Sequence, residues 1–247
     1  MSDTRAAILQ SLASGQFQSG EELAASLGIS RTAVWKHIAQ LRDLGVAIET
    51  QQSKGYRLAQ FEPLNHEVLQ QAAGDCLVEL HSVLESTNTH LLERGLGADE
   101  QSRACLTEIQ TAGRGRRGRE WLAPPGSGLC MSLAWRFEQL PASPGSLSLA
   151  VGVWVAEALE SLGVQIQLKW PNDLYAVVAG KPAKLGGILV ELRGELSGTA
   201  TVIVGIGLNH RLPAETVTEL DRAVTDIQQL TGNQGPGRNV IGGAILK

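Results

Sequence analysis

The first 44 residues contain three segments in which hydrophobic positions recur at helical spacing. Apolar residues predict a first helix over residues 4–14. Ser19 and Glu22 have the spacing of a capping box, so a second helix begins there, and Gly28 ends it. A third helix follows over residues 31–44.

The third predicted helix has one apolar and one polar face, and an alternating pattern over residues 46–58 predicts a hairpin after it. Its inner face carries Val34, Ile38 and Leu41. The residues that we expect to contact DNA are Arg31, Thr32, Trp35, Lys36 and Gln40 on the outer face and Lys54 in the hairpin. A basic helix face beside a basic hairpin suits insertion into the major groove with flanking phosphate contacts. The segment resembles a winged helix-turn-helix module; the alternative is a three-helix packing module with a solvated polar face.

Phe61 to Pro63 interrupts this pattern, and we place a domain boundary there. We expect a winged helix-turn-helix DNA-binding domain over residues 1–62 and a second domain over residues 63–247. Apolar runs in the second domain predict strands over 76–83, 104–109, 129–135, 166–173, 184–192 and 199–209, and a long helix that begins at Pro144 and ends at Gly163. The mixture predicts an α+β chain.

Size and composition describe a globular protein. With 247 residues and 43% hydrophobic content, the chain can bury a substantial core. It has no apolar run of about 18 residues and no secretory signal pattern, so we expect a cytoplasmic protein that is not in a membrane. The three cysteines are predicted to be buried thiols. The net charge of −4 divides into six basic minus five acidic residues, or +1, before residue 61, and fifteen minus twenty, or −5, after it.

The segment from Thr111 to Arg119 combines three glycines with four arginines and indicates an anion site. Glycine lets a ligand approach the backbone, and guanidinium groups match phosphate or carboxylate oxygens. No Gly-Lys-Ser/Thr pattern follows, so the segment is not a P-loop. An RNA-binding Gly/Arg tract is the alternative, but predicted strands flank the segment. We therefore expect a loop mounted on a sheet that stays mobile until its ligand neutralises it, as a lid does.

Polar residues also gather where predicted strands end. Ser86, Thr87 and Asn88 follow the strand at 76–83 and can either cap the next helix or bind a ligand. The strand at 166–173 closes on a Pro-Asn-Asp sequence that fits either a binding site or a simple turn.

These motifs occur in one fixed order, and that order resembles the biotin protein ligase family. The motifs are Ser86 to Asn88, Gln110, Gly113 to Gly118, Lys169 to Asp173, Lys184 to Glu191, and Gly205 to Asn209. With the winged module in front, the chain resembles the bifunctional members that also repress biotin synthesis genes. The resemblance implies a mixed-sheet α/β catalytic domain of the biotin/lipoate ligase type. It also implies a two-step reaction: biotin and ATP form biotinyl-5′-AMP, and biotin then passes to a lysine of the biotin carboxyl carrier protein.

The resemblance assigns roles residue by residue. Biotin contacts would come from Ser86, Thr87, Asn88, Gln110, Arg114, Gly115, Arg116 and Lys184. Nucleotide contacts would come from Arg116, Arg117, Trp121, Asn172 and Asn209, with Mg²⁺ arriving on ATP and no metal site of the chain's own. Lys184 and Arg116 would be catalytic, and Lys169 and Asp173 would support the site as an ion pair.

The expected partners are the carrier protein, operator DNA and a second copy of the chain. We expect ligand to promote this homodimer through the sheet edge in the 184–209 region and the loops that the adenylate orders. Compared with the family, the hairpin over 177–183 is longer, and we expect the SH3-like carboxy-terminal domain to be absent. The alternatives are a biotin-sensing DNA-binding regulator without catalysis and a lipoate-type ligase. Lys184 and the basic loop speak against the first, and the basic loop and winged module against the second.

Overall fold

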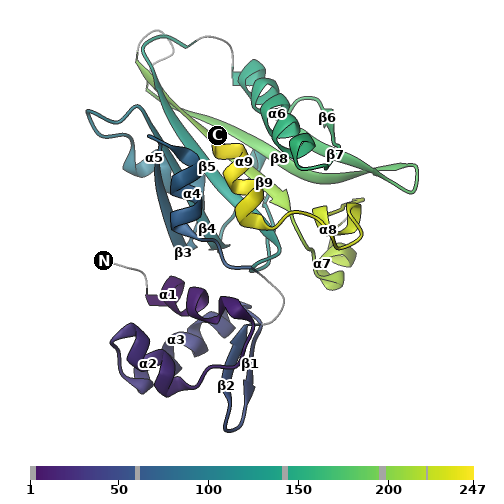
Figure 1. Ribbon diagram of the computed structural model, residues 1–247. Helices are drawn as coiled ribbons and strands as arrows, with labels where there is room; N and C mark the ends of the chain where they lie inside the picture. Colours follow the sequence, from purple (N-terminus) through teal and green to yellow (C-terminus); the bar gives the residue numbers. More distant parts are fainter. Residues whose placement is uncertain (1–3, 59–61, 141–143, 195–198, 221) are drawn as a thin grey trace.

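The computed structural model describes residues 4–58, 62–140, 144–194, 199–220 and 222–247. Its amino-terminal part is a small helical module with a two-stranded hairpin, drawn in purple and blue at the bottom of Figure 1. The elements are α1 (Thr4–Ser11), η1 (Leu12–Ser14), α2 (Gly20–Leu27), α3 (Arg31–Asp43), β1 (Ile48–Gln51) and β2 (Gly55–Leu58). This is the predicted winged helix-turn-helix arrangement.

Local signals set the ends of these elements as the sequence predicts. Glu22 N–H donates to Ser19 Oγ at 3.1 Å and Ser19 N–H donates to Glu22 Oε2 at 2.8 Å, which completes the capping box. Gly28 ends α2 in the left-handed region at φ 65°. At the hairpin, Gly55 has φ 96°, and a Cβ there would overlap the backbone of Gln18, so this position requires glycine.

The larger part is built on a seven-stranded mixed sheet in the order β3-β4-β5-β9-β8-β7-β6. The β3–β4 pair is parallel and the remaining pairs are antiparallel. The strands are β3 (Leu77–Leu84), β4 (Ser102–Gln110), β5 (Gly128–Phe137), β6 (Gln167–Lys169), β7 (Asp173–Val178), β8 (Lys181–Gly194) and β9 (Ala200–Asn209). The helices are α4 (His66–Ala73), α5 (Thr87–Arg94), η2 (Arg116–Gly118), α6 (Pro144–Ser161), α7 (Ala214–Glu219), α8 (Ile227–Leu230) and α9 (Arg238–Leu246).

Helices cover both faces of this sheet. On one face, α4, α6 and α9 lie side by side and share a core with the sheet (Figure 1). On the other face, α5 packs over a smaller apolar cluster. Successive side chains of β4 point to opposite faces of the sheet. Ala104 and Leu106 therefore enter the core on the first face, whereas Cys105 enters the cluster on the second. The α+β prediction is confirmed.

Two contacts tie distant segments to this sheet. Arg238 on α9 forms a buried ion pair with Glu108 on β4 at 2.7 Å, and it also donates to the carbonyl of Glu62. At the next residue of β4, Ile109 is buried in the core of the amino-terminal module, against which Val83 also packs. The predicted domain boundary begins at Phe61, which lies outside the described residues, as does Ser143 before the predicted helix start.

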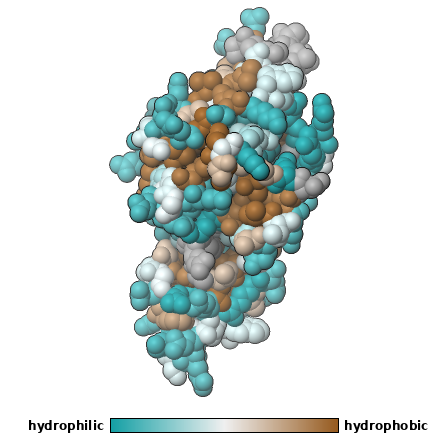
Figure 2. Space-filling view, turned by 90° about the vertical axis from the view of Figure 1, so that its right-hand side faces the viewer, coloured by the Kyte–Doolittle hydropathy of each residue, from teal (hydrophilic) through white to brown (hydrophobic). Residues whose placement is uncertain are grey.

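The surface is mostly hydrophilic, with apolar patches. Figure 2 shows brown patches on the side of the molecule that carries α6, where Leu149 and Leu168 line a shallow depression. No helix within the described ranges is long and apolar enough to cross a membrane. All three cysteines are free; Cys105 and Cys130 are buried as predicted, whereas Cys76 is half-buried at the turn before β3.

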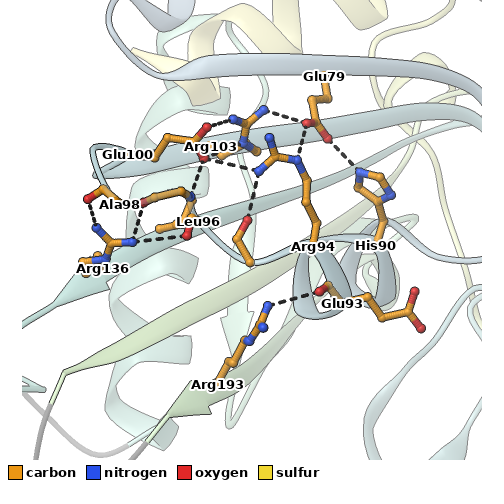
Figure 3. Close-up of polar contacts among 12 residues, drawn as sticks. Glu79, His90, Glu93, Arg94, Leu96, Ala98, Glu100, Arg103, Arg136 and Arg193 are labelled. Atoms are coloured by element: carbon orange, nitrogen blue, oxygen red, sulfur yellow. Dashed lines mark hydrogen bonds and ion pairs between the residues drawn. The ribbon is translucent and has the colours of Figure 1, made fainter.

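An ion-pair network holds α5 against the edge of the sheet (Figure 3). Glu79 on β3 lies 2.6 Å from Arg103 Nη1, 2.8 Å from Arg94 Nε and 2.7 Å from His90 Nε2. Glu100 completes the network through ion pairs with both arginines. The charges of two carboxylates are thus balanced by those of two guanidinium groups. These ion pairs hold α5 in position, and the first residues of α5 line the cavity described below.

The Glu79 carboxylate should make stability depend on pH in the acid range. Burial alone would raise its pKa, but the neighbouring imidazoles, Arg103 and Arg94 lower the pKa from 4.5 to about 2. A carboxyl group with a depressed folded pKa stabilises the protein above its unfolded pKa, and this stabilisation is lost as pH falls towards 2.

When the pH falls from 5 to 3, the free energy of unfolding should therefore fall less in Glu79→Gln than in the parent. We expect the two decreases to differ by on the order of 2 kcal/mol. Urea unfolding at the two pH values measures this difference. Glu157→Gln, which removes an exposed carboxylate on α6, should behave as the parent does. Equal pH dependence in Glu79→Gln and the parent would refute the role assigned to Glu79.

Candidate active site

A cavity of about 230 Å³ opens between the start of α5, the basic loop and strands β8 and β9. Nearly all the predicted ligand-site residues line it: Ser86, Thr87, Asn88, Gln110, Arg114, Gly115, Arg116, Arg117, Trp121, Asn172 and Lys184. The exception is Asn209. The fold therefore brings together residues from five separate stretches of sequence.

The first residues of α5 form a polar wall of the cavity. Ser86 caps the helix, because its side chain accepts from Thr89 N–H at 3.4 Å. Gln110, at the end of β4, accepts from Thr87 N–H at 2.9 Å and from the Thr87 hydroxyl at 3.2 Å. The sequence left capping and ligand binding open for this motif. In the structure Ser86 does cap, while Thr87 and Gln110 orient each other beside the cavity.

Asn88 is almost entirely buried and lies deeper in this wall. Its Oδ1 is 2.5 Å from Ser132 Oγ, and its Nδ2 donates to Glu191 at 2.9 Å and to the Leu189 carbonyl at 3.3 Å. A Cβ on Gly205 would overlap this amide. Asn88 therefore shapes the wall with an amide that is already bonded to protein groups.

The basic loop is folded across the cavity by its own backbone. Trp121 N–H donates to Gly113 O at 2.9 Å, and Gly115 N–H donates to Arg119 O at 2.7 Å. Outside contacts fix two of its arginines: Arg114 pairs with Glu191 at 2.8 Å, and Arg116 donates to Asn172 at 2.9 Å. The loop is mounted on the sheet as predicted.

Lys184 on β8 points into the cavity and forms an ion pair with Asp173 at 2.5 Å. Strand register explains its direction. Asp173 lies opposite Gly187 and Tyr175 opposite Lys184, with a bulge between these two pairings. The bulge at Leu185 places Lys184 on the same face as Asp173, whereas a regular strand would send residues 184 and 187 to opposite faces. Burial lowers the pKa of Lys184, and the hydrogen bond with Asp173 opposes that effect.

One expected contact is wrong. Lys169 and Asp173 were expected to form an ion pair, and they do face each other across β6 and β7. Asp173 pairs with Lys184 instead, and the Lys169 ammonium lies 4.8 Å from the centre of the Tyr175 ring. The register shift that turns Lys184 inward supplies Asp173 with its partner.

Asn209 lies outside the cavity. Its amide donates to the carbonyls of Thr225, at 3.0 Å, and Lys184, at 3.5 Å, so it supports the backbone behind Lys184. Trp121 does line the cavity, where its ring lies so close to Gly207 that a Cβ there would overlap it. Its buried indole N–H lies beside the Cys130 thiol and makes no other hydrogen bond among the described residues.

Sequence reasoning assigned no role to Ser132, Glu191 or Arg222. Ser132 is fully buried and lies 2.7 Å from Thr87 Oγ1, so its hydroxyl supports the polar wall. Arg222 lines the cavity from the segment after α7. A lone serine within a strand carries no pattern that would single it out. Glu191 belongs to a recognised motif, but no local signal shows what its carboxylate contacts.

Comparisons with known proteins agree with this geometry. The model of the biotin/lipoate A/B protein ligase family matches residues 80–209, and a model of an HTH domain matches residues 4–57. The first match spans more than half of the chain and includes most of the cavity. The chain belongs to the biotin/lipoate A/B protein ligase family.

Individual members of this family are similar over most of the chain. Bifunctional ligase/repressor BirA of Escherichia coli (strain K12) is 46% identical over 201 residues, which cover 80% of this chain and 61% of the relative. BirA of Bacillus subtilis (strain 168) is 34% identical over 246 residues, covering 96% and 74%. A solved structure of biotin protein ligase from Aquifex aeolicus in complex with biotin and ATP has 31% identity and a TM-score of 0.54, covering 69% and 67%. The chain thus spans about three fifths of the length of the Escherichia coli relative.

The HTH domain of this family member presents its predicted DNA-contacting residues to solvent. Arg31, Thr32, Trp35, Lys36, Gln40 and Lys54 are all exposed. Arg31 forms an ion pair with Glu21 at 2.7 Å, but both side chains are highly exposed, so this pair is weak and leaves Arg31 able to bind phosphate. Arg42 and Arg57 instead donate to the hairpin itself.

A group of possible metal ligands lies outside the cavity. Glu79, His81, His90 and Cys105 bring ligand atoms within 4.8 Å of one another. The adjacent guanidinium groups of Arg94 and Arg103 oppose a further cation there, and burial raises the pKa of the Cys105 thiol. We assign this group the structural role described above.

Proposed function

We propose that the chain is an ATP-dependent biotin protein ligase that forms biotinyl-5′-AMP and transfers biotin to a lysine of the biotin carboxyl carrier protein. The observation that carries this proposal is the position of Lys184, which the β-bulge turns into the same cavity as the polar wall and the arginine loop. The similar ligase from Aquifex aeolicus is named for biotin, and it is in complex with biotin and ATP. This name and these ligands support biotin and ATP as the proposed substrates.

The cavity offers what the first step requires. Ser86, Thr87 and Gln110 hold the ureido end of biotin, and Lys184 lies where the biotin carboxylate meets the α-phosphate of ATP. The carboxylate oxygen attacks this phosphorus and pyrophosphate leaves, so two anions must come together. Lys184 and Arg116 neutralise their repulsion in the transition state. MgATP enters as the substrate, with Trp121 and Asn172 beside the nucleotide.

The second step is an acyl transfer. The carrier lysine attacks the carbonyl carbon of biotinyl-5′-AMP, an amide bond forms and AMP leaves. The arginine loop shields the mixed anhydride from water until the carrier arrives. We propose that the loop is more mobile without ligand than with it. The use of ATP and operator DNA fits a cytoplasmic protein.

A non-catalytic biotin sensor is the second candidate function. It would need the HTH domain and the polar wall, but not a lysine aimed between two anions. A lipoate-type ligase shares the family, but the arginine loop and the HTH domain favour biotin. Incubation with biotin, MgATP and a carrier domain distinguishes the two functions. The mass of the carrier domain increases if the chain is an enzyme and stays unchanged if it is a sensor.

Lys184→Ala should lower the rate of biotinyl-5′-AMP synthesis by on the order of 10²–10³ while biotin still binds, more weakly. Pyrophosphate release measures the rate, and isothermal titration measures biotin binding. Lys181→Ala, which changes an exposed lysine on the same strand, is the matched control and should keep the parent rate. Near-normal pyrophosphate release by Lys184→Ala would remove Lys184 from its assigned role.

We also propose that the chain represses biotin synthesis genes by binding operator DNA. The double variant Arg31→Ala/Lys36→Ala should bind operator DNA more weakly. The slope of log binding constant against log salt should fall by roughly one for each lost phosphate contact. Fluorescence anisotropy across a salt series measures both, with Lys181→Ala as the control. An unchanged salt slope would count against the proposed DNA face.

We further propose that ligand promotes a homodimer through β8. Within the described residues, β9 is interior to the sheet, and β7 pairs with β8 only as far as Gly187. Ile188 bonds to Asn172 and the Leu189 carbonyl accepts from Asn88, so the free edge is confined to residues 190–194, a shorter stretch than the predicted 184–209 region. Unpaired strand edges are suited to pairing with another chain. Sedimentation should show a larger mass with biotinyl-5′-AMP, and identical masses with and without it would reject the coupling.

A further inference from the structure

Glu191 joins two parts of the cavity that come from distant stretches of the chain. It lies on β8 with a side chain that is 21% exposed. One carboxylate oxygen accepts from Asn88 Nδ2 at 2.9 Å, in the polar wall. Both oxygens also accept from Arg114, at 2.8 and 3.2 Å. A single carboxylate therefore connects the polar wall with the first arginine of the basic loop.

The contact with Asn88 fixes the orientation of a buried amide. Ser132 Oγ lies at the acceptor end of this amide, and Glu191 lies at its donor end. An ionised carboxylate can only accept hydrogen bonds, so it selects the amide nitrogen. The amide can then turn in only one way. Without an acceptor at position 191, a buried N–H would lose one of its partners, which is costly.

The contact with Arg114 fixes the position at which the basic loop begins. Two parallel hydrogen bonds to a carboxylate define the plane of a guanidinium group. Arg114 also donates to Thr89 Oγ1 at 3.3 Å, so its guanidinium rests on both β8 and α5. Its side chain is 45% exposed, and an exposed ion pair alone contributes little to stability. The consequence of this pair is therefore local: it sets where the loop begins its path over the cavity.

We propose that Glu191 is a positioning residue that holds the arginine loop in place over the polar wall and so retains biotin and its adenylate. The kinetic part of this inference rests on the proposed ligase function. A loop that is already in place loses less conformational freedom when the ligand binds. Removal of the Glu191 charge should therefore weaken ligand retention, whereas the chemistry at Lys184 continues.

The first experiment uses trypsin without any ligand, because the loop contains four potential cleavage sites. Glu191→Gln keeps an acceptor for Asn88 but loses the charge that pairs with Arg114. We expect cleavage within residues 114–119 to rise about fivefold, with cleavage elsewhere unchanged. Glu85→Gln, which changes an exposed carboxylate beside Ser86, is the matched control. Equal loop cleavage in Glu191→Gln and the parent would overturn the proposal, as would a uniform rise at all sites.

The second experiment separates positioning from general stability. In pyrophosphate-release assays, Glu191→Gln should raise the KM for biotin about fivefold and leave kcat within about twofold of the parent, because it removes binding without touching the reacting groups. In an Arg114→Gln background, Glu191→Gln should add little further, since the two side chains act through one contact. Full additivity, or a loss confined to kcat, would contradict the proposal.

The two experiments distinguish the two hypotheses. If the parent makes no biotinyl-5′-AMP, the proposed function fails, yet the trypsin assay still decides whether Glu191 holds the loop. If the parent is active and Glu191→Gln matches it in loop cleavage and KM, the ligase function stands and the role of Glu191 falls.

Discussion

One extra residue in β8 determines which way Lys184 points, and the chemistry proposed for the cavity depends on that direction. The bulge at Leu185 turns the lysine towards Asp173. The backbone behind it is fixed as well, because Lys184 N–H donates to Ala223 O and Lys184 O accepts from Thr225 N–H, each at 2.9 Å. A half-buried ammonium in this setting is already oriented and partly desolvated, which is the state in which a cation best stabilises a developing negative charge.

The cavity has an excess of positive charge even though Arg114 pairs with Glu191 and Lys184 pairs with Asp173. Its described lining contains the cations Arg114, Arg116, Arg117, Arg119, Lys184 and Arg222, against the carboxylates of Glu120 and Asp173. Such a surface favours anions, which a carboxylate and a triphosphate supply. It also explains why the loop needs contacts such as the one with Glu191: guanidinium groups that repel one another do not hold a closed conformation by themselves.

Strand β4 connects the amino-terminal module with the cavity. Ile109 is buried in the core of that module, while its neighbour Gln110 orients Thr87 in the polar wall. A single rigid element thus contacts both the domain proposed to bind DNA and the pocket proposed to bind biotin. This continuity gives ligand binding and DNA binding a shared physical element, in addition to the proposed dimer edge.

The sequence by itself determined the features that depend on neighbours a few residues apart. The capping box at Ser19, the end of α2 at Gly28 and the strand that precedes Ser86 follow from local hydrogen bonds, backbone sterics and periodicity. The order of the motifs also identified most of the cavity lining. Only the tertiary structure decided which side chains meet across strands. The pairing of Asp173 with Lys184 in place of Lys169, the position of Asn209 behind the site and the support from Ser132 and Glu191 all depend on strand register. A one-residue shift in register sends a side chain to the opposite face, and no local pattern encodes it.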